Sequence, residues 1–260
     1  MSNYATTGPL DVTSAFHAAQ AARDWSGWLR DRLPLRFAMH VLDAGCGTGA
    51  LWRGAVPPGA DLTLLDSSAA MLSEAGAALA HLRPAIVEAD LGTGALPRGP
   101  FDLVVAAHVL HHMRDPGAVI DRLRRRLAPG GALAVTMIGG GTLPIVGALL
   151  AGLHGVDPTR AVRERFPPDL AASLLAGRFA TVVRHDLADR YRIADAGLLA
   201  GYDLSFPPGP DLADDAREAI RERVADRIAA AGGSLDADVR AALLIAGGGP
   251  GGGGCSHPPN

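Results

Sequence analysis

The sequence predicts an α/β fold built on a doubly wound, mainly parallel sheet, and two observations predict it. From residue 40 onward, short apolar runs alternate with longer helix-like segments. The apolar runs are continuous rather than interrupted by polar residues, which is typical of parallel strands buried on both faces. Strand–helix alternation at this spacing indicates helices on both faces of one sheet. The predicted strands are residues 41–42, 62–65, 85–87, 103–107, 132–136, 181–185 with a continuation at 191–193, and 239–246.

Helical patterns flank and separate these strands. The first predicted helix, residues 13–33, is amphipathic, with Phe16, Trp25, Trp28 and Leu29 on its apolar side. The other predicted helices are residues 69–82, 116–127 and 211–231.

The same patterns divide the chain into three parts. Residues 1–39 form an N-terminal helical segment, and residues 40–246 form the main domain. A lid insertion is expected within this domain at about residues 139–176. Residues 247–260 are nearly all glycine and proline, so we expect a disordered tail.

The composition excludes several chemistries. All 24 basic side chains of the 260-residue chain are arginines, because the sequence contains no lysine. A lysine Schiff base, a Walker-type phosphate-binding lysine and a Tyr-x-x-x-Lys dehydrogenase pair are therefore excluded. The formal net charge of −3 gives no global attraction to nucleic acid or to an anionic membrane.

Cysteine usage and the apolar segments predict a cytoplasmic protein. Two cysteines, Cys46 and Cys255, are too few for a disulfide framework, which is typical of a reducing cytosol. Residues 1–10 lack a basic segment followed by an apolar run, so we expect no signal peptide. The most apolar stretch, residues 142–156, contains glycine and is shorter than the roughly 20 residues that a membrane span needs.

A glycine-rich loop follows the first predicted strand. Gly45, Gly47 and Gly49 let the backbone turn sharply and approach a ligand closely, and a helix after the loop would point its N-terminus at that ligand. The pattern alone is weak, because with Ala50 it also fits the dinucleotide fingerprint G-x-G-x-x-G/A. The loop therefore predicts an adenosyl cofactor without identifying which one.

Three acidic residues at successive strand ends favour S-adenosylmethionine (SAM). Asp43 would repel a pyrophosphate and attract the α-ammonium of a methionine moiety. Asp66 lies about 20 residues past the loop, where an acid accepts hydrogen bonds from ribose hydroxyls. Asp90 can accept from the exocyclic amine of adenine, with Leu91 against the ring. The alternative, that Asp66 and Asp90 only cap helices, stays open.

Six motifs occur in order between residues 40 and 136: VLDAGCGTG (41–49), LDSSxxML (65–72), EAD (88–90), FDLV (101–104), VLHHM (109–113) and LAPGG (127–131). On these motifs the chain resembles the class I SAM-dependent methyltransferases, in particular the UbiE-like or methyltransferase type 11 group. The resemblance thins afterwards, where residues 179–195 look like the family's sixth strand and residues 239–246 like its last. It implies a Rossmann-like seven-stranded sheet in the order 3-2-1-4-5-7-6, with the last strand antiparallel.

The resemblance also implies roles for single residues. The loop glycines wrap the methionine part of SAM, Asp66 takes the ribose, and Asp90 with Leu91 takes the adenine near Met71. Tyr4 is a further candidate for the cofactor carboxylate. The implied cofactor-binding residues are Asp43, Gly45, Cys46, Gly47, Gly49, Asp66, Ser67, Met71, Asp90, Leu91, His108 and Val109.

Three histidines follow the fourth predicted strand. His108, His111 and His112 could supply two metal ligands on one face, but the resembling family often carries histidine here without a metal, and we expect none. Methyl transfer mainly needs in-line positioning, and a neutral hydroxyl acceptor also benefits from a base. We therefore take His108 and His112 as the candidate catalytic residues, and expect His112→Ala to lower turnover while SAM affinity stays within a few-fold.

The predicted lid indicates the acceptor. Its apolar content predicts a small, largely apolar molecule, although packing of the same residues in the core is an equal alternative. Arg160, Arg163 and Arg165 could bind an acidic group or form a solvated helix face. Neither an Asn-Pro-Pro-aromatic motif nor a Pro-Cys motif for base methylation is present, so we expect no nucleic-acid partner.

The predicted function is SAM-dependent methylation of a small molecule at oxygen or carbon, in bacterial secondary metabolism. Carrier-bound carboxyl O-methylation is a near variant, suggested by residues 141–144. A nicotinamide-dependent oxidoreductase and a non-catalytic SAM-binding regulator are the alternatives. The sequence leaves the acceptor, the methylated atom and the oligomeric state open.

Overall fold

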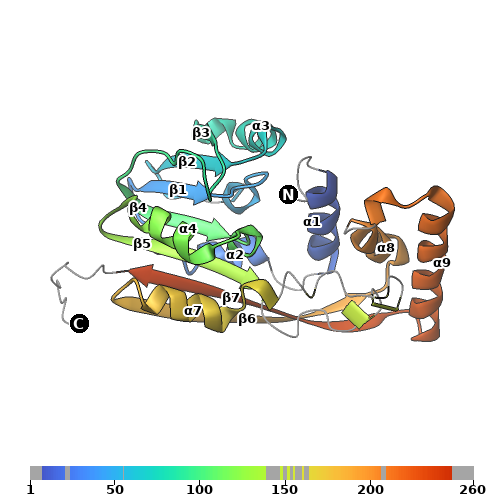
Figure 1. The fold of residues 1–260 in the computed structure, drawn as a ribbon. Helices are drawn as coiled ribbons and strands as arrows, with labels where there is room; N and C mark the ends of the chain where they lie inside the picture. The colour runs from blue at the N-terminus through green and yellow to red at the C-terminus, as the bar shows by residue number, and fades with distance from the viewer. Residues whose placement is uncertain are drawn as a thin grey trace.

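The computed structural model contains a seven-stranded sheet with helices on both faces, which confirms the predicted fold class (Figure 1). The described part of the chain comprises residues 8–20, 24–54, 56–138, 147–148, 151–152, 155, 160, 164–205 and 209–247. Its strands are β1 His40–Ala44, β2 Asp61–Asp66, β3 Ala85–Glu88, β4 Phe101–Ala107, β5 Leu127–Ile138, β6 Thr181–Ile193 and β7 Leu235–Gly247.

The strand order is β3-β2-β1-β4-β5-β7-β6, as predicted. Strands β1 to β5 pair in parallel, whereas β7 is antiparallel to both β5 and β6. The direction in which strands are added reverses between β1 and β4. From β1 the chain adds β2 and β3 toward one edge of the sheet, and from β4 it adds the remaining strands toward the other edge. In open α/β sheets, ligands bind beyond the carboxyl ends of the strands at such a switch point. The topology therefore brings the residues that follow β1 and β4 to one place.

Helices cover the two faces of the sheet because adjacent strand residues point to opposite sides. Val41 packs in the core under α2 and α3, and Leu42 packs in the core under α4 and α7. The helices are α1 Gly8–Gln20, α2 Trp25–Arg30, α3 Ala69–Ala78, α4 Pro116–Arg124, α7 Pro168–Ala176, α8 Ala196–Leu204 and α9 Asp214–Ala230, with 3₁₀ turns η1 Ala50–Trp52, η2 Ala80–Leu82, η3 Leu110–His112 and η4 Gly209–Asp211.

A third core lies at the far end of the β6–β7 hairpin. These two strands pair along their whole length, but β5 pairs with only the last seven residues of β7, Ala241 to Gly247. The rest of the hairpin extends beyond the sheet and carries α8 and α9, with α1 packed beside them (Figure 1). Phe16, Leu199 and Val224, one from each helix, are fully buried in this core. The N-terminal helix α1 is thus held by the C-terminal hairpin.

Our prediction of a helix directly after the glycine loop is wrong. Only the single 3₁₀ turn η1 follows the loop. Gly54, Pro57 and Pro58 come soon after it, and proline cannot continue a helix because it lacks the N–H and clashes with the preceding turn. A one-turn helix has little macrodipole. Ligand binding here must therefore depend on the loop amides and the neighbouring carboxylates.

Other elements differ in extent from the predictions. Residues 13–33 do not form one helix, since α1 and α2 are separate elements. Helix α8 was not predicted, because its sequence is almost uniformly apolar and shows no amphipathic pattern. Strand β6 runs without a break through the expected gap between 185 and 191. The antiparallel partner β7 supports this continuity, because it pairs with every residue of β6.

The predicted segments that flank the sheet are only partly described. The tail beyond residue 247 and half of the lid range, including residues 139–146, lie outside the described residues. The last nine residues of the lid range form α7, whose Ala171 and Leu175 are fully buried in the core. None of the described helices is both long and apolar enough to cross a membrane.

Candidate functional site

The glycine loop adopts a backbone that other residues rarely take. Gly45, Gly47 and Gly49 have φ angles of +84°, +53° and +70°, in the left-handed region that favours glycine. A Cβ atom on Gly45 would lie 2.5 Å from Cγ2 of Val109. The amide of Gly45 donates to the carbonyl oxygen of Leu65 in β2 at 2.7 Å. The loop is therefore fixed between the ends of β1, β2 and β4.

Gly45→Ala tests this close packing. The new methyl group would contact Val109 too closely and would strain the backbone at positive φ, so we expect a loss of about 1 to 3 kcal/mol in the free energy of unfolding. Chemical denaturation measures it. Gly76→Ala is the control: this residue lies in α3, its added Cβ would meet Ile86 Cδ1 at an ordinary 3.7 Å, and alanine favours helix. Equal stability of the Gly45 and Gly76 variants would contradict the packing described here.

Asp43 is a buried carboxylate with an unused acceptor. Its side chain is 2% exposed, and Oδ2 accepts a hydrogen bond from Nε1 of Trp52 at 2.8 Å. Oδ1 is buried without a hydrogen-bond partner among the described residues. The pKa of Asp43 is raised to about 7, mainly by burial; the hydrogen bond from Trp52 opposes this rise, and the nearby charge of Asp66 contributes to it. A buried oxygen without a donor fits a cationic N–H group of a ligand, such as the ammonium of SAM.

Asp66 is oriented by the loop that it faces. Its Oδ2 accepts from the amide of Gly47 at 3.0 Å, and its Oδ1 accepts from the amide of Ser68 at 3.0 Å. The side chain remains partly exposed. Ser68 in turn caps α3 by accepting from the amide of Met71. The carboxylate is thus held at the carboxyl end of β2 with lone pairs still available to ribose hydroxyls, while Ser68 rather than Asp66 provides the helix cap.

Asp90 is exposed and makes local contacts. Its Oδ1 accepts from the amide and the hydroxyl of Thr93, at 2.7 and 2.8 Å. The hydroxyl hydrogen bond lowers the pKa of Asp90, so the group is an anion at neutral pH. These contacts lie within a turn, since residues 91–94 form no helix, so Asp90 does not have the helix-capping role that we left open. Binding of adenine by the same carboxylate stays a prediction.

The remaining predicted cofactor residues differ in exposure. Ser67 is exposed, whereas Met71 and Leu91 are 1% and 4% exposed and pack in the cores. Cys46 is partly exposed, and burial raises the pKa of its thiol, so it stays protonated. Tyr4 lies outside the described residues. The structure thus brings the glycine loop, Asp43 and Asp66 together most clearly.

His108 ends β4 in a strained conformation. Its φ of +51° is unusual for a residue with a Cβ, and its amide donates to Oγ1 of the buried Thr136 at 3.0 Å. Nδ1 of the ring is buried without a hydrogen-bond partner among the described residues. Burial lowers the pKa of His108 to about 4, with smaller contributions from His17 and His112. The imidazole is therefore neutral at pH 7 and has a free ring nitrogen.

His111 and His112 lie in the 3₁₀ turn η3, soon after His108. Their rings are 4.0 Å apart, and His111 is 9% exposed. Burial lowers the pKa of both, as does the positive charge of Arg165, while the negative charge of Asp66 acts on His112 in the opposite direction. No group of three metal-ligating side chains forms anywhere in the described ranges. The negative charge of Asp66 therefore reaches His112, and His112 in turn contributes to the lowered pKa of His108.

Residues from outside the recognised motifs complete the surroundings of His108. The Trp25 ring of α2 is 4.9 Å from the His108 ring. Nδ1 of His17 in α1 lies 3.1 Å from the hydroxyl of Tyr191 in β6. We placed Trp25 on an apolar helix face, but no sequence pattern joins α1 or β6 to β4. These contacts are long-range and could not be predicted.

Of the three lid arginines, Arg160 pairs with Glu164 at 2.7 Å on an exposed helix face. Arg163 lies outside the described residues. Arg165 is exposed and close enough to influence the histidines of η3. Arg160 therefore lies on a solvated face, which was one of the two alternatives, whereas Arg165 is positioned to bind an anion.

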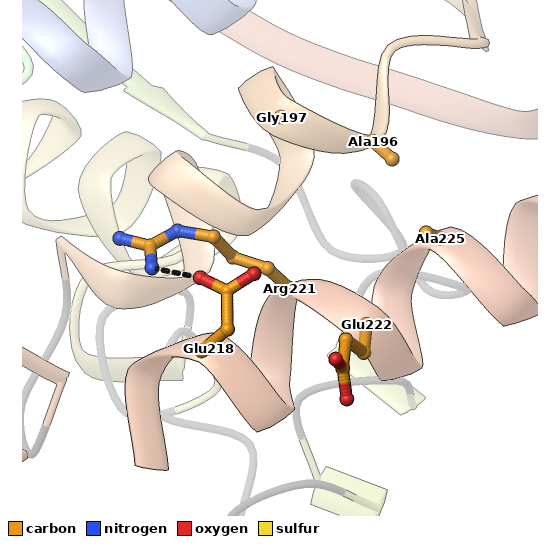
Figure 2. A pocket seen from close by; sticks show the side chains of 6 residues that line it. All are labelled: Ala196, Gly197, Glu218, Arg221, Glu222 and Ala225. Atoms are coloured by element: carbon orange, nitrogen blue, oxygen red, sulfur yellow. Dashed lines mark hydrogen bonds and ion pairs between the residues drawn. The ribbon is translucent and has the colours of Figure 1, made fainter. Parts of the chain in front are cut away.

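A shallow pocket of about 270 Å³ lies between α8 and α9, where Arg221 pairs with Glu218 (Figure 2). It lies at the distal end of the hairpin, far from β1 and the glycine loop (Figure 1). The residues that line it are Ala196, Gly197, Glu218, Arg221, Glu222 and Ala225. Its position separates it from the candidate site.

Comparisons with known proteins agree with this geometry. Residues 42–133 match the sequence model of a family described as a methyltransferase domain. Malonyl-[acyl-carrier protein] O-methyltransferase of Enterobacter lignolyticus is 34% identical over 152 residues, 58% of this chain and 60% of that protein. Ubiquinone biosynthesis O-methyltransferase of Caulobacter sp. is 32% identical over 171 residues, 61% of this chain and 64% of that protein. The chain thus spans less than two thirds of either relative.

A solved structure supports the fold. Phosphoethanolamine N-methyltransferase 2 of Haemonchus contortus, in complex with S-adenosyl-L-methionine, has a TM-score of 0.57 to this chain at 16% identity. The match covers 93% of this chain and 57% of that one.

Proposed function

From the class I SAM-dependent methyltransferase domain that the chain carries, with SAM as its cofactor, we propose that the chain methylates an oxygen atom of a small acceptor. The observation that carries this proposal is Oδ1 of Asp43, which is buried beside the glycine loop and Asp66 and has no hydrogen-bond partner among the described residues. An oxygen acceptor is supported by the two relatives, both of which are named O-methyltransferases.

The bound cofactor would supply a methyl group already activated on a sulfonium. The chain itself then needs to hold the acceptor in line and to provide a place for a proton. His108 suits both tasks, because its imidazole is neutral at pH 7 and its Nδ1 has no hydrogen-bond partner among the described residues. A pKa of about 4 makes it a weak base, so we assign it mainly to positioning.

Carboxyl O-methylation is a second candidate. The observation that favours it is Arg165, an exposed cation whose charge acts on His111 and His112. The malonyl-carrier relative supports the same class of acceptor by its name. An acceptor of this class would place its carboxylate on the Arg165 side.

We also propose that the protein acts in the cytoplasm and in secondary metabolism. The cysteine usage favours the cytoplasm, and the net charge of −3 argues against nucleic-acid and membrane partners. A role in secondary metabolism is supported by the biased composition and by analogy with the resembling family.

Ligand-dependent melting separates the rival functions. We expect SAM and S-adenosylhomocysteine to raise the melting temperature and NADH to have no effect, because only a ligand that binds the folded state stabilises it. A shift with NADH alone would contradict the proposed function and favour the oxidoreductase alternative. Release of S-adenosylhomocysteine, measured with a panel of hydroxyl and carboxylate acceptors, then separates an enzyme from a binding-only protein.

A further inference from the structure

The indole of Trp52 is a fixed donor to the buried carboxylate of Asp43. Trp52 is fully buried, and its Nε1–H donates to Oδ2 of Asp43 at 2.8 Å. An indole has one N–H donor and no acceptor, so this contact occupies Oδ2 and leaves Oδ1 available. Oδ1 is itself buried without a hydrogen-bond partner among the described residues. The two oxygens of a buried carboxylate therefore share a single donor.

The indole of Trp52 does not by itself require a carboxylate. A backbone carbonyl or a side-chain amide would accept from the N–H without burying a charge, which is costly. The carboxylate also brings a second oxygen that needs a donor. This arrangement is understandable if a ligand donates to Oδ1 of Asp43. A cationic donor suits a carboxylate best, and the α-ammonium group of SAM is such a donor.

The turn that carries the indole is held from two sides. The amide of Trp52 donates to the carbonyl oxygen of Gly49 in the glycine loop at 3.0 Å. From α2, Nη1 of Arg30 donates to the carbonyl oxygen of Leu51 at 2.8 Å. The guanidinium of Arg30 also lies close to Gly54, where an added Cβ would be 2.6 Å from its Cζ. The glycine loop and α2 together therefore fix the position of the indole.

We infer that Trp52 is a positioning residue, which holds Asp43 so that Oδ1 accepts from the α-ammonium group of SAM. A carboxylate with one oxygen held by a fixed donor loses much of its freedom to rotate, so the direction of Oδ1 is set as well. The same hydrogen bond favours the ionised form, since it lowers the pKa of Asp43, which burial and the charge of Asp66 raise. This inference rests on the proposed function and assigns a further residue to its cofactor site.

Two ligands that differ only in the ammonium group test this role. They are S-adenosylhomocysteine and its deamino analogue, in which hydrogen replaces the α-ammonium group. In titration calorimetry at pH 7, we expect the wild-type full chain to bind S-adenosylhomocysteine at least about tenfold tighter, because only this ligand donates to the carboxylate. Equal affinity would overturn the inference and leave the proposed function intact. Binding of neither ligand would contradict both.

Trp52→Phe removes the donor and keeps an aromatic ring. Without the indole N–H, the carboxylate of Asp43 is less well oriented and less readily ionised. We expect the variant to bind S-adenosylhomocysteine about 5- to 10-fold more weakly, and the deamino analogue within about twofold of the wild type. The preference between the two ligands therefore falls. Equal weakening of both ligands would show that Trp52 only supports the packing of the turn, and this result or an unchanged preference would overturn the inference.

Asp43→Asn shows whether Trp52 acts through Asp43. Asparagine keeps an acceptor for the indole and loses the charge, so this variant is expected to lose most of the preference for S-adenosylhomocysteine. Adding Trp52→Phe to Asp43→Asn should then change the preference by less than about twofold, because the group through which Trp52 acts is already neutral. A further fall as large as that in the wild-type background would overturn the inference.

Two arginines close together in the sequence provide a matched pair of variants. Arg30→Met removes the hydrogen bond to the Leu51 carbonyl and is expected to lower the preference about 2- to 3-fold. Arg32 is exposed and donates to the carbonyl oxygen of Trp28 at 2.9 Å, at the end of its own helix. Arg32→Met should therefore match the wild type. Equal loss of preference in the two variants would overturn the inference that a fixed turn positions the indole.

A measurement on the wild-type chain decides the matter if Trp52→Phe does not fold. The chain has three tryptophans, and Trp25→Phe and Trp28→Phe identify the NMR signals of the other two indole N–H groups. We expect S-adenosylhomocysteine to shift the Trp52 signal more than the deamino analogue does, because an ammonium group on Oδ1 changes the charge that Oδ2 presents to the indole. Equal shifts with the two ligands, or no shift with either, would overturn the inference.

Discussion

Asp66→Ala is expected to weaken SAM binding by about 100-fold, or about 2.7 kcal/mol. The variant loses an ionised acceptor, whose hydrogen bonds contribute about 1.5 to 3 kcal/mol each. It also loses the two contacts that hold the amides of Gly47 and Ser68. Titration calorimetry with SAM measures the loss directly.

A matched control lies on the same strand. Asp61, at the other end of β2, is exposed and pairs only at the surface with His40, at 3.3 Å. Asp61→Ala should leave SAM affinity within about twofold, because exposed pairs contribute little. If Asp66→Ala bound SAM within threefold of the wild type, the site described here would be wrong.

Asp43→Asn is expected to change how stability depends on pH in the absence of ligand. Burial raises the pKa of Asp43 from 3.8 to about 7 in the folded state. Between these values the folded chain binds more protons than the unfolded chain, so this residue's contribution to stability falls as pH rises from about 4 to about 7. Asparagine does not titrate. The unfolding free energy of the variant, relative to that of the wild type, should therefore rise by about 4 kcal/mol across this pH window.

The unfolding free energy of the variant must be compared with that of the wild type at each pH, because other buried groups make the protein more stable, not less, as the pH rises. Burial lowers the pKa of His17 and His108 to about 4 and that of His111 to about 3. Their contribution to stability is lost as pH falls below about 6.5. Urea denaturation of both proteins at several pH values gives the difference in unfolding free energy, in which the contributions of these histidines cancel. A difference in unfolding free energy that stays constant within about 1 kcal/mol would contradict the buried, raised-pKa state of Asp43.

The sheet and the cofactor loop could be predicted because their signals are local. Continuous apolar runs encode buried parallel strands. The glycines at 45, 47 and 49 encode positive φ, which the structure confirms. Asp43 and Asp66 each stand at a strand end, and strand ends meet at one edge of a parallel sheet. Spacing along the chain was therefore enough to place them together.

The acceptor side could not be predicted, because its contacts join distant parts of the chain. His17 meets Tyr191 across 174 residues, and the recognised motifs cover only residues 40–136. Sequence spacing also treated His108 and His112 as equivalent candidates. The structure distinguishes them, because His108 has a positive φ and its ring contacts that of Trp25, whereas the charge of Asp66 acts on His112.

The prediction of a full helix after the loop failed for a local reason. Gly54, Pro57 and Pro58 were visible in the sequence, and both residue types disfavour helix. The resulting single turn increases the dependence of ligand binding on Asp43 and Asp66.

Methyl transfer from SAM with a deuterated methyl group tests the central claim most directly. The full chain is incubated with labelled SAM and a panel of acceptors that carry a hydroxyl group, such as 2-naphthol, or a carboxylate, such as a malonyl thioester. The products are analysed by mass spectrometry. We predict that the label appears on an acceptor oxygen with one S-adenosylhomocysteine released per product, and that Asp66→Ala abolishes it at limiting SAM. Saturable SAM binding without label on any acceptor in the panel would contradict an enzymatic role, and no SAM binding would contradict the site itself.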